Sequence, residues 1–257
     1  MRVLVDVVVV VSVAFLSVAF FTLLDRKVLG YGQMRKGPFK VFVGGVIQPL
    51  LDGVKLFLKG WINVSGLGGV EVFLGACVVF SMMILSWFVV LGLSGSFETT
   101  ASLLVVLLLS GVGVVGMLSV GLFSGSVYSV LGVLRSVAQM VSYEVVMGLG
   151  LIFVFMGVWS VGSIKGMGWF LGIFWCVVMM IVVVMEVNRT PVDFLEGESE
   201  LVSGGVTELG GLVFALLFMA EYGLMGFYSV LISILAVGKM SVVFVVFLIY
   251  SFSWVRL

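Results

Sequence analysis

Long apolar runs separated by short polar segments dominate the pattern of this 257-residue chain. A helix needs about 20 apolar residues to cross the roughly 30 Å hydrocarbon layer of a bilayer. The charged triplet Asp25-Arg26-Lys27 ends the first run after a full span, and no small-residue cleavage site follows, so we expect a retained helix and no signal peptide. The pattern predicts one membrane domain, 1–257, with spans at residues 3–24, 72–93, 101–122, 145–161, 169–185, 210–235 and 241–255.

Two polar segments, residues 25–71 and 186–209, interrupt these runs and are predicted to be the functional loops. The first contains a short amphipathic stretch in which apolar residues recur at helical spacing, while Asp52, Lys55 and Lys59 face the other side. Such a helix lies in the plane of the membrane interface. It could roof the entrance for a lipid-soluble substrate or serve only as a surface anchor. The apolar positions are Ile47, Leu50, Leu51, Val54 and Leu58.

Composition sets the class of protein. Hydrophobic residues make up 62% and charged residues 10%, whereas soluble proteins average about 25% charged residues. We therefore expect an all-α polytopic membrane protein with about seven transmembrane helices, an amphipathic helix on the inner face and structured charged loops. The net charge of zero gives no support for nucleic-acid binding. With no histidine and only Cys77 and Cys176, the chain is predicted to hold no metal and no redox centre of its own.

The positive charges predict the orientation. Ten of the 13 Lys and Arg residues lie in loops that follow the first, third, fifth and seventh spans. Under the positive-inside rule, these loops face the cytoplasm or the mitochondrial matrix. Residues 25–59 carry seven positive and two negative groups, a net charge of +5, and residues 186–221 carry one positive and seven negative groups, a net charge of −6. Both segments are predicted to lie at this same membrane face.

Two acids fall within or beside predicted spans. Glu221 lies well inside the sixth span, where an ionised carboxylate costs several kcal/mol unless it is paired, hydrated or protonated. It is a candidate proton-relay group, and the alternative is a structural hydrogen bond to a neighbouring helix. Glu144 precedes the fourth span, beside a polar stripe formed by Arg135, Gln139 and Tyr143 at four-residue spacing. That stripe could relay protons or only anchor the helix at the interface.

The segment from Glu186 to Glu208 gathers six acids between two apolar runs. A flexible soluble connector would instead be rich in Ser, Gly, Pro and Lys. Val192, Phe194 and Leu195 are interleaved with the acids, so we expect a structured segment with a buried side. Calcium binding is a weaker alternative, because the spacing does not match a helix–loop–helix calcium site.

Five motifs occur in the order in which a known family has them: DRKVLGYGQMRKGP, QPLLDGVKLFLK, LRSVAQMVSYEV, EVNRTPVDFLEGESELVSG and FALLFMAEY. On these motifs the chain resembles subunit 1 of NADH:quinone oxidoreductase, respiratory complex I, from Leu24 to Arg256. Relatives of that family include the anchoring subunit of membrane-bound hydrogenases and a plastoquinone-reducing counterpart.

The resemblance implies a non-redox membrane subunit that encloses the ubiquinone tunnel with two peripheral-arm subunits, beside small membrane subunits and lipid. Flavin and iron–sulfur clusters would belong to the partner subunits. Tunnel or interface roles fall on Arg26, Arg35, Lys36, Asp52 and Lys55. The proton-coupling path falls on Glu144, Glu186, Asp193, Glu196, Glu198, Glu208 and Glu221. The location implied is the mitochondrial inner membrane with matrix-side charged loops, and a bacterial plasma membrane is the second choice.

Some positions depart from the family pattern. Asp25 stands in place of the usual Glu, Phe39 in place of Asn, and Gly60 in place of a common Glu. The sequence ends at Leu257, where the family continues into an inner loop and an eighth helix, so a naturally short chain or a second polypeptide is expected. Two other functions stay open: a hydrogenase-anchoring subunit and a stand-alone ion channel or carrier.

Overall fold

A computed structural model describes residues 2–42, 44–59, 68–95, 99–161, 169–190, 192–193, 195, 204–206, 209–237 and 241–255. All regular elements in these ranges are helices, as the sequence predicts. They are α1 (Arg2–Gly32), α2 (Gln48–Leu58), α3 (Gly68–Gly95), α4 (Thr99–Leu122), α5 (Val127–Val161), α6 (Trp169–Glu186), the 3₁₀ turn η1 (Gly204–Val206), α7 (Gly211–Val237) and α8 (Val242–Val255).

Two helices extend well beyond the spans that the sequence predicts within them. The helix α1 does not end before Asp25-Arg26-Lys27 but continues through this triplet to Gly32. The fourth predicted span, residues 145–161, is only the second half of α5, which begins at Val127. Glu144 therefore lies in the middle of a 35-residue helix and not near its start. In both places, hydropathy falls because polar side chains enter the sequence, although the backbone stays helical.

Within the described residues, five helices are long and apolar enough to cross a membrane: α1, α3, α4, α5 and α7. The apolar helices α6 and α8 are shorter, over Gly172–Glu186 and Val242–Val255. The predicted amphipathic helix is confirmed as α2, with Pro49 in its first turn, where a missing N–H breaks no helical hydrogen bond. Leu50, Val54 and Leu58 on its apolar side are all exposed.

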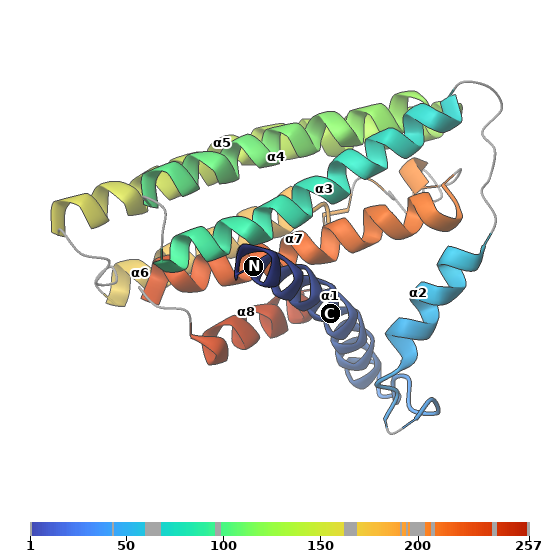
Figure 1. Ribbon diagram of the computed structural model, residues 1–257, viewed down its shortest axis with the longest axis horizontal. Helices are drawn as coiled ribbons and strands as arrows, with labels where there is room; N and C mark the ends of the chain where they lie inside the picture. Colours follow the sequence, from blue (N-terminus) through green and yellow to red (C-terminus); the bar gives the residue numbers. More distant parts are fainter. Residues whose placement is uncertain are drawn as a thin grey trace.

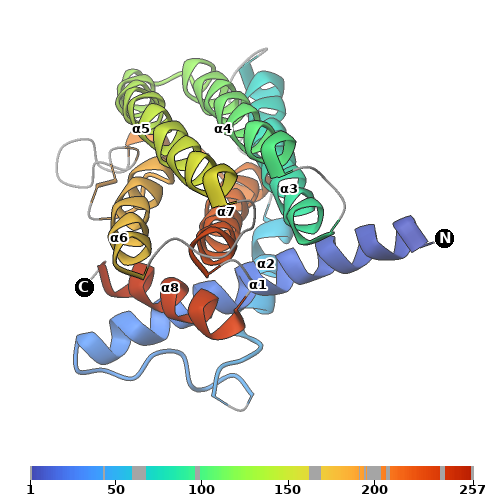
Figure 2. The same ribbon diagram turned by 90° about the vertical axis from the view of Figure 1, so that its left-hand side faces the viewer.

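The helix α7 lies at the centre of the bundle, with α3, α4, α5 and α6 along one side and α1 and α8 along the other (Figures 1 and 2). It contacts α1, α2, α3, α6 and α8. Small residues bring its neighbours together: a Cβ on Gly75 of α3 would lie 2.2 Å from Ser119 Oγ of α4. A Cβ on Gly121 of α4 would likewise lie 2.4 Å from Val133 Cβ of α5. Such close backbone approach is typical of helix pairs in membranes.

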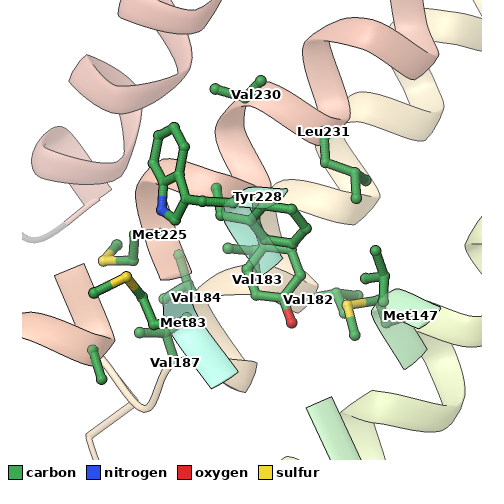
Figure 3. Close-up of a cluster of buried hydrophobic side chains, with 14 of the residues drawn as sticks. Met83, Met147, Val182, Val183, Val184, Val187, Met225, Tyr228, Val230 and Leu231 are labelled. Carbon is green, nitrogen blue, oxygen red and sulfur yellow. The ribbon is translucent and has the colours of Figure 1, made fainter. Parts of the chain in front are cut away.

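The core lies between α3, α5, α6 and α7. Figure 3 shows Met83, Met147, Val183 and Tyr228 converging there from four helices. All four side chains are buried. Methionine side chains adapt to irregular gaps, so they fill a core of this kind well. Polar side chains that share this interior form the candidate site.

Candidate functional site

The end of α6 turns the chain back into the protein. Asn188 has a φ of +52°, a left-handed conformation that asparagine tolerates better than most residues. The N–H of Asn188 donates to the carbonyl of Met185 at 3.4 Å, and that of Arg189 donates to the carbonyl of Val184 at 3.3 Å. This pair of bonds is the Schellman motif that ends many helices. It directs Arg189 toward α7.

Arg189 is buried against three side chains of α7. Its Nη2 lies 3.2 Å from Glu221 Oε2, and the side chains of Arg189 and Glu221 are only 8% and 14% exposed. The guanidinium carbon lies 4.2 Å from the ring centroid of Tyr222 and 5.2 Å from that of Phe218. Aromatic faces attract a guanidinium group, and more strongly when water is excluded. An ion pair and two rings therefore hold this cation inside the protein.

The surroundings of Arg189 keep it charged. Burial alone lowers the pKa of its guanidinium group, but Glu221, Tyr222, Asp25 and Asp193 outweigh this effect, and the pKa is raised above its ordinary value. Asp25 belongs to α1 and is itself buried. The start of the basic segment and the acidic segment around Arg189 therefore lie close together.

Gln139 of α5 ties the acidic segment to the bundle. Its Nε2 donates to the carbonyl of Met185 at 2.9 Å and lies 3.4 Å from the carbonyl of Val192. Farther along the segment, the N–H of Gly205 donates to the carbonyl of Leu195 at 2.9 Å, and both residues are buried. The prediction of a structured segment with a buried side is confirmed for these residues.

The predicted polar stripe on α5 runs from the surface to the interior. Arg135 is exposed, Tyr143 is half-buried and Gln139 is buried. Directly after Tyr143, Glu144 accepts a hydrogen bond at 2.8 Å from the hydroxyl of Ser110 on α4. Glu144 also interacts electrostatically with Glu186 at the end of α6. The structure therefore brings two of the predicted coupling acids together across three helices.

Glu186 is 4% exposed and lines a cavity of about 40 Å³. Ser86 of α3, Ser110 of α4 and Tyr228 of α7 line the same cavity. Tyr228 interacts electrostatically with both Glu186 and Glu144. A carboxyl group, three hydroxyls and enclosed space are the parts from which proteins build internal proton paths.

A second cluster lies outside this core, at the end of α1. Arg26 forms an ion pair with Asp52 of α2, and Gln48 Nε2 donates to the other carboxylate oxygen of Asp52 at 2.9 Å. A cleft of about 640 Å³ opens beside them. It is lined by Arg26, Arg35, Lys36, Lys40 and Gln48, together with Leu29, Gly37, Pro38, Phe39 and Val41. Lys55 is exposed on α2 and is not among the lining residues.

The predicted site residues divide into three groups. The structure gathers Glu144 with Glu186, and Glu221 with Asp193 around Arg189. It gathers Arg26, Arg35 and Lys36 around the cleft, with Asp52 paired to Arg26. Glu196, Glu198 and Glu208 lie outside the described residues.

Sequence reasoning missed Arg189 as a site residue. One signal was available: Arg189 is the one cation against seven acids in residues 186–221, so it had to neutralise some of them. Ser86, Ser110 and Tyr228 gave no such signal, because hydroxyl residues are common in membrane helices. In the part of the chain that the structure describes, no group of three or more His, Cys, Asp or Glu side chains could hold a metal ion.

Helices long enough to cross a bilayer, packed around buried charges, define a polytopic membrane protein with an internal ionisable site. The NADH dehydrogenase family matches residues 5–257. The chain therefore belongs to the NADH dehydrogenase family.

Three relatives illustrate the match. The chain is 41% identical over 261 residues to NADH-ubiquinone oxidoreductase chain 1 of Heterololigo bleekeri, covering 95% of this chain and 83% of the relative. It is 40% identical over 231 residues to the protein of the same name from Branchiostoma lanceolatum, covering 86% and 72%. It is also 40% identical over 235 residues to a bacterial relative, one of the NADH-quinone oxidoreductase subunits of Rhodospirillum rubrum, covering 86% and 69%.

Proposed function

We propose that this chain is the quinone-site membrane subunit of a proton-pumping NADH:ubiquinone oxidoreductase. It carries no redox centre and couples quinone reduction, performed with peripheral-arm subunits, to proton translocation. Flavin and iron–sulfur clusters reside in partner subunits, and ubiquinone is the substrate. The protein spans the mitochondrial inner membrane several times, with its charged loops on the matrix side. Family membership, together with the names of its relatives, supports this proposal.

The cleft at the end of α1 is our candidate for part of the quinone path. Quinone carbonyl oxygens accept hydrogen bonds, which Arg26, Arg35 and Lys36 can donate. The apolar tail of a quinone needs a dry surface, and the exposed apolar side of α2 adjoins this cleft through the Arg26–Asp52 pair. Lys55, on the same helix, is assigned to the interface with partner subunits.

The buried acids are our candidates for the coupling path. The assignment of the coupling path rests on one observation: Glu221 lies inside a candidate membrane helix and is paired with a buried arginine. A charge pair at such a position responds to any change in the charge or shape of its surroundings. Glu144, Glu186 and Asp193 lie in or near the same interior, and Glu196, Glu198 and Glu208 extend the assignment along the acidic segment.

The test is Glu221→Gln in the assembled complex, reconstituted in liposomes. We expect assembly to persist and NADH-driven proton uptake to fall at least about tenfold, because removal of a positioned proton-transfer group costs that much or more. Glu71→Gln is the matched control, since Glu71 is an exposed acid in the first turn of α3. Unchanged coupled activity in a fully assembled Glu221→Gln complex would contradict the coupling assignment.

The composition of the purified assembly tests the wider proposal. Gentle detergent purification should yield a large complex with flavin, iron–sulfur clusters and inhibitor-sensitive NADH:quinone activity. Nickel in the partner subunits would identify a hydrogenase-anchoring subunit instead. A lone chain or small homo-oligomer that transports ions without partners would identify a channel or carrier.

A further inference from the structure

The helix α2 begins beside the end of α1, and its first residue, Gln48, contacts the ion pair that joins the two helices (Figure 1). Gln48 is half-buried and lines the cleft together with Arg26. Its Nε2 donates to Asp52 Oδ1 at 2.9 Å, while Asp52 Oδ2 pairs with Arg26 Nη1. Gln48, Asp52 and Arg26 therefore form one chain of contacts from α2 to α1.

The backbone around Gln48 is held in place. The N–H of Gln48 donates to the carbonyl of Gly45 at 3.1 Å. Gly45 has a φ of +80°, and a Cβ there would lie 2.3 Å from the carbonyl oxygen of Pro38, so this position requires glycine. Pro38 lines the same cleft. The turn before α2 is thus packed against the wall of the cleft, and the backbone of Gln48 is fixed relative to it.

The side chain of Gln48 fixes the carboxylate of Asp52. The two residues are four positions apart, so they lie on the same face of α2. A carboxylate only accepts hydrogen bonds, so the amide nitrogen of Gln48 must face Asp52. One carboxylate oxygen is bonded to Gln48 and the other is paired with Arg26, so the group cannot rotate without losing a contact. The amide of Gln48 therefore sets the orientation of the carboxylate that holds Arg26.

Arg26 needs this support because its ion pair is solvated. The side chains of Arg26 and Asp52 are 55% and 33% exposed, and a solvated pair alone restrains two flexible side chains only weakly. The contact with Asp52 uses Nη1 of a guanidinium group that carries five N–H donors, so other donors can serve an acceptor in the cleft. A donor that is already oriented binds its ligand more tightly, because less side-chain freedom is lost on binding.

We propose that Gln48 is a positioning residue for quinone binding: through Asp52 it orients the guanidinium group of Arg26 to donate to a quinone carbonyl oxygen in the cleft. Gln48 acts through Arg26 and does not itself touch the quinone. Its effect on the quinone rests on the proposed function, whereas its effect on the orientation of Arg26 stands on the contacts within the protein.

Two substitutions separate positioning from a merely structural role. Gln48→Met keeps the length of the side chain and removes the amide donor. Gln48→Glu keeps its shape, but a carboxylate accepts and does not donate, so the bond to Asp52 is lost as well. Glutamine, glutamate and methionine have similar helix propensities, and an acid in the first turn favours a helix. Gln48→Glu therefore preserves α2 while it disrupts the orientation of Arg26.

The first measurement is a ubiquinone titration of the NADH:quinone activity of the assembled complex. We expect both variants to raise the KM for ubiquinone about two- to tenfold, which corresponds to the ordering of one long side chain. The kcat should stay unchanged, because the lost interaction serves binding and not the chemical step. In an Asp52→Ala complex, Gln48→Met should have no further effect, since no carboxylate remains to be oriented.

Two results of this titration would show a structural role and overturn the proposal. One is a raised KM in Gln48→Met together with a normal KM in Gln48→Glu. The other is an effect of Gln48→Met that is equally large with and without the carboxylate of Asp52, because a residue that acts through Asp52 depends on it.

The second measurement is an electron cryo-microscopy map of the same complexes. We expect one position of the Arg26 guanidinium group in the unmodified complex and in the control Lys59→Gln, an exposed site just past the end of α2. In Gln48→Met its density should weaken or split, and an unchanged Arg26 would overturn the positioning role. Failure of the proposed function has a different signature: Arg26 loses its order in Gln48→Met, but the KM stays unchanged in Arg26→Gln. That result would overturn the quinone part and support the orientation of Arg26 by Gln48.

Discussion

The helices α1 and α7 offer candidate spans of equal length, 26 residues each, yet they occupy opposite environments. Over their most apolar stretches, 72% of residues are buried in α7 and only 17% in α1. Over these stretches, α1 is the more apolar of the two helices and yet the more exposed one. In a bilayer the lipid tails are as apolar as leucine, so hydrophobicity does not decide which helix is central.

Small and polar residues decide which helix is central. Ala220 has no exposed surface, and the carbonyl of Gly223 accepts a hydrogen bond at 3.1 Å from Trp87 Nε1 of α3. By contrast, α1 presents Val8, Leu16 and Phe20 outward, where lipid can cover them. Close packing and interhelical hydrogen bonds therefore identify α7 as the interior helix.

Each of these helices also contributes to an ion pair, and the two pairs differ in exposure as the helices do. The side chains of Arg26 and Asp52, beside α1, are 55% and 33% exposed. Those of Arg189 and Glu221, beside α7, are 8% and 14% exposed. Solvated pairs contribute little to stability, whereas a buried charge depends strongly on its partner.

The largest expected effect comes from breaking the buried pair. Arg189→Met or Glu221→Leu should each destabilise the assembled complex by roughly 3–5 kcal/mol, because each leaves a buried charge without its partner. The double variant should recover much of this loss, since both desolvation penalties disappear. Thermal denaturation of the purified complexes, with the amount assembled in the membrane, measures both effects. A loss in the double variant equal to the sum of the two single losses would show that the two charges do not depend on each other.

Packing gives the next largest difference between the two helices. Phe227→Ala on α7 removes a side chain that is 1% exposed. A cavity on the order of 100 Å³, at about 24 cal/mol per Å³, corresponds to roughly 2 kcal/mol of lost stability. Phe20→Ala on α1 is the control, because lipid fills the space that this exposed ring leaves. The same thermal assay should show almost no change for Phe20→Ala, and similar losses at both positions would contradict the contrast between α1 and α7.

Local patterns were enough to predict the helical class and α2. The spacing of Leu50, Leu51 and Val54 already defines an apolar side within one short segment. Hydropathy did not predict the end of α1 or the start of α5, because polar residues lie inside a continuing helix at both places. Asp25 is buried near Arg189, and Gln139 bonds the carbonyl of Met185, so tertiary partners stabilise these polar positions.

The centre of the candidate site required the packing of distant segments. Arg189 and Glu221 are far apart in the sequence, and their pairing depends on the turn after α6 and on its contact with α7. Likewise, Ser110 and Glu144 meet because α4 packs against α5. The sequence marked Glu144 and Glu221 as unusual, but their partners could not be read from spacing.

The smallest expected effect on stability belongs to the exposed pair of α1 and α2. Arg26→Gln should destabilise the complex by only about 0.2–1 kcal/mol, because solvent already screens both charges. If the cleft belongs to the quinone path, the same variant should still raise the KM for ubiquinone, since a donor in the cleft is lost. Lys59→Gln, just past the end of α2 and exposed, controls for the loss of one positive charge. Thermal denaturation and quinone titration of the assembled complex separate the two effects. A stability loss as large as that of Glu221→Leu would remove the distinction between a solvated pair and a buried one.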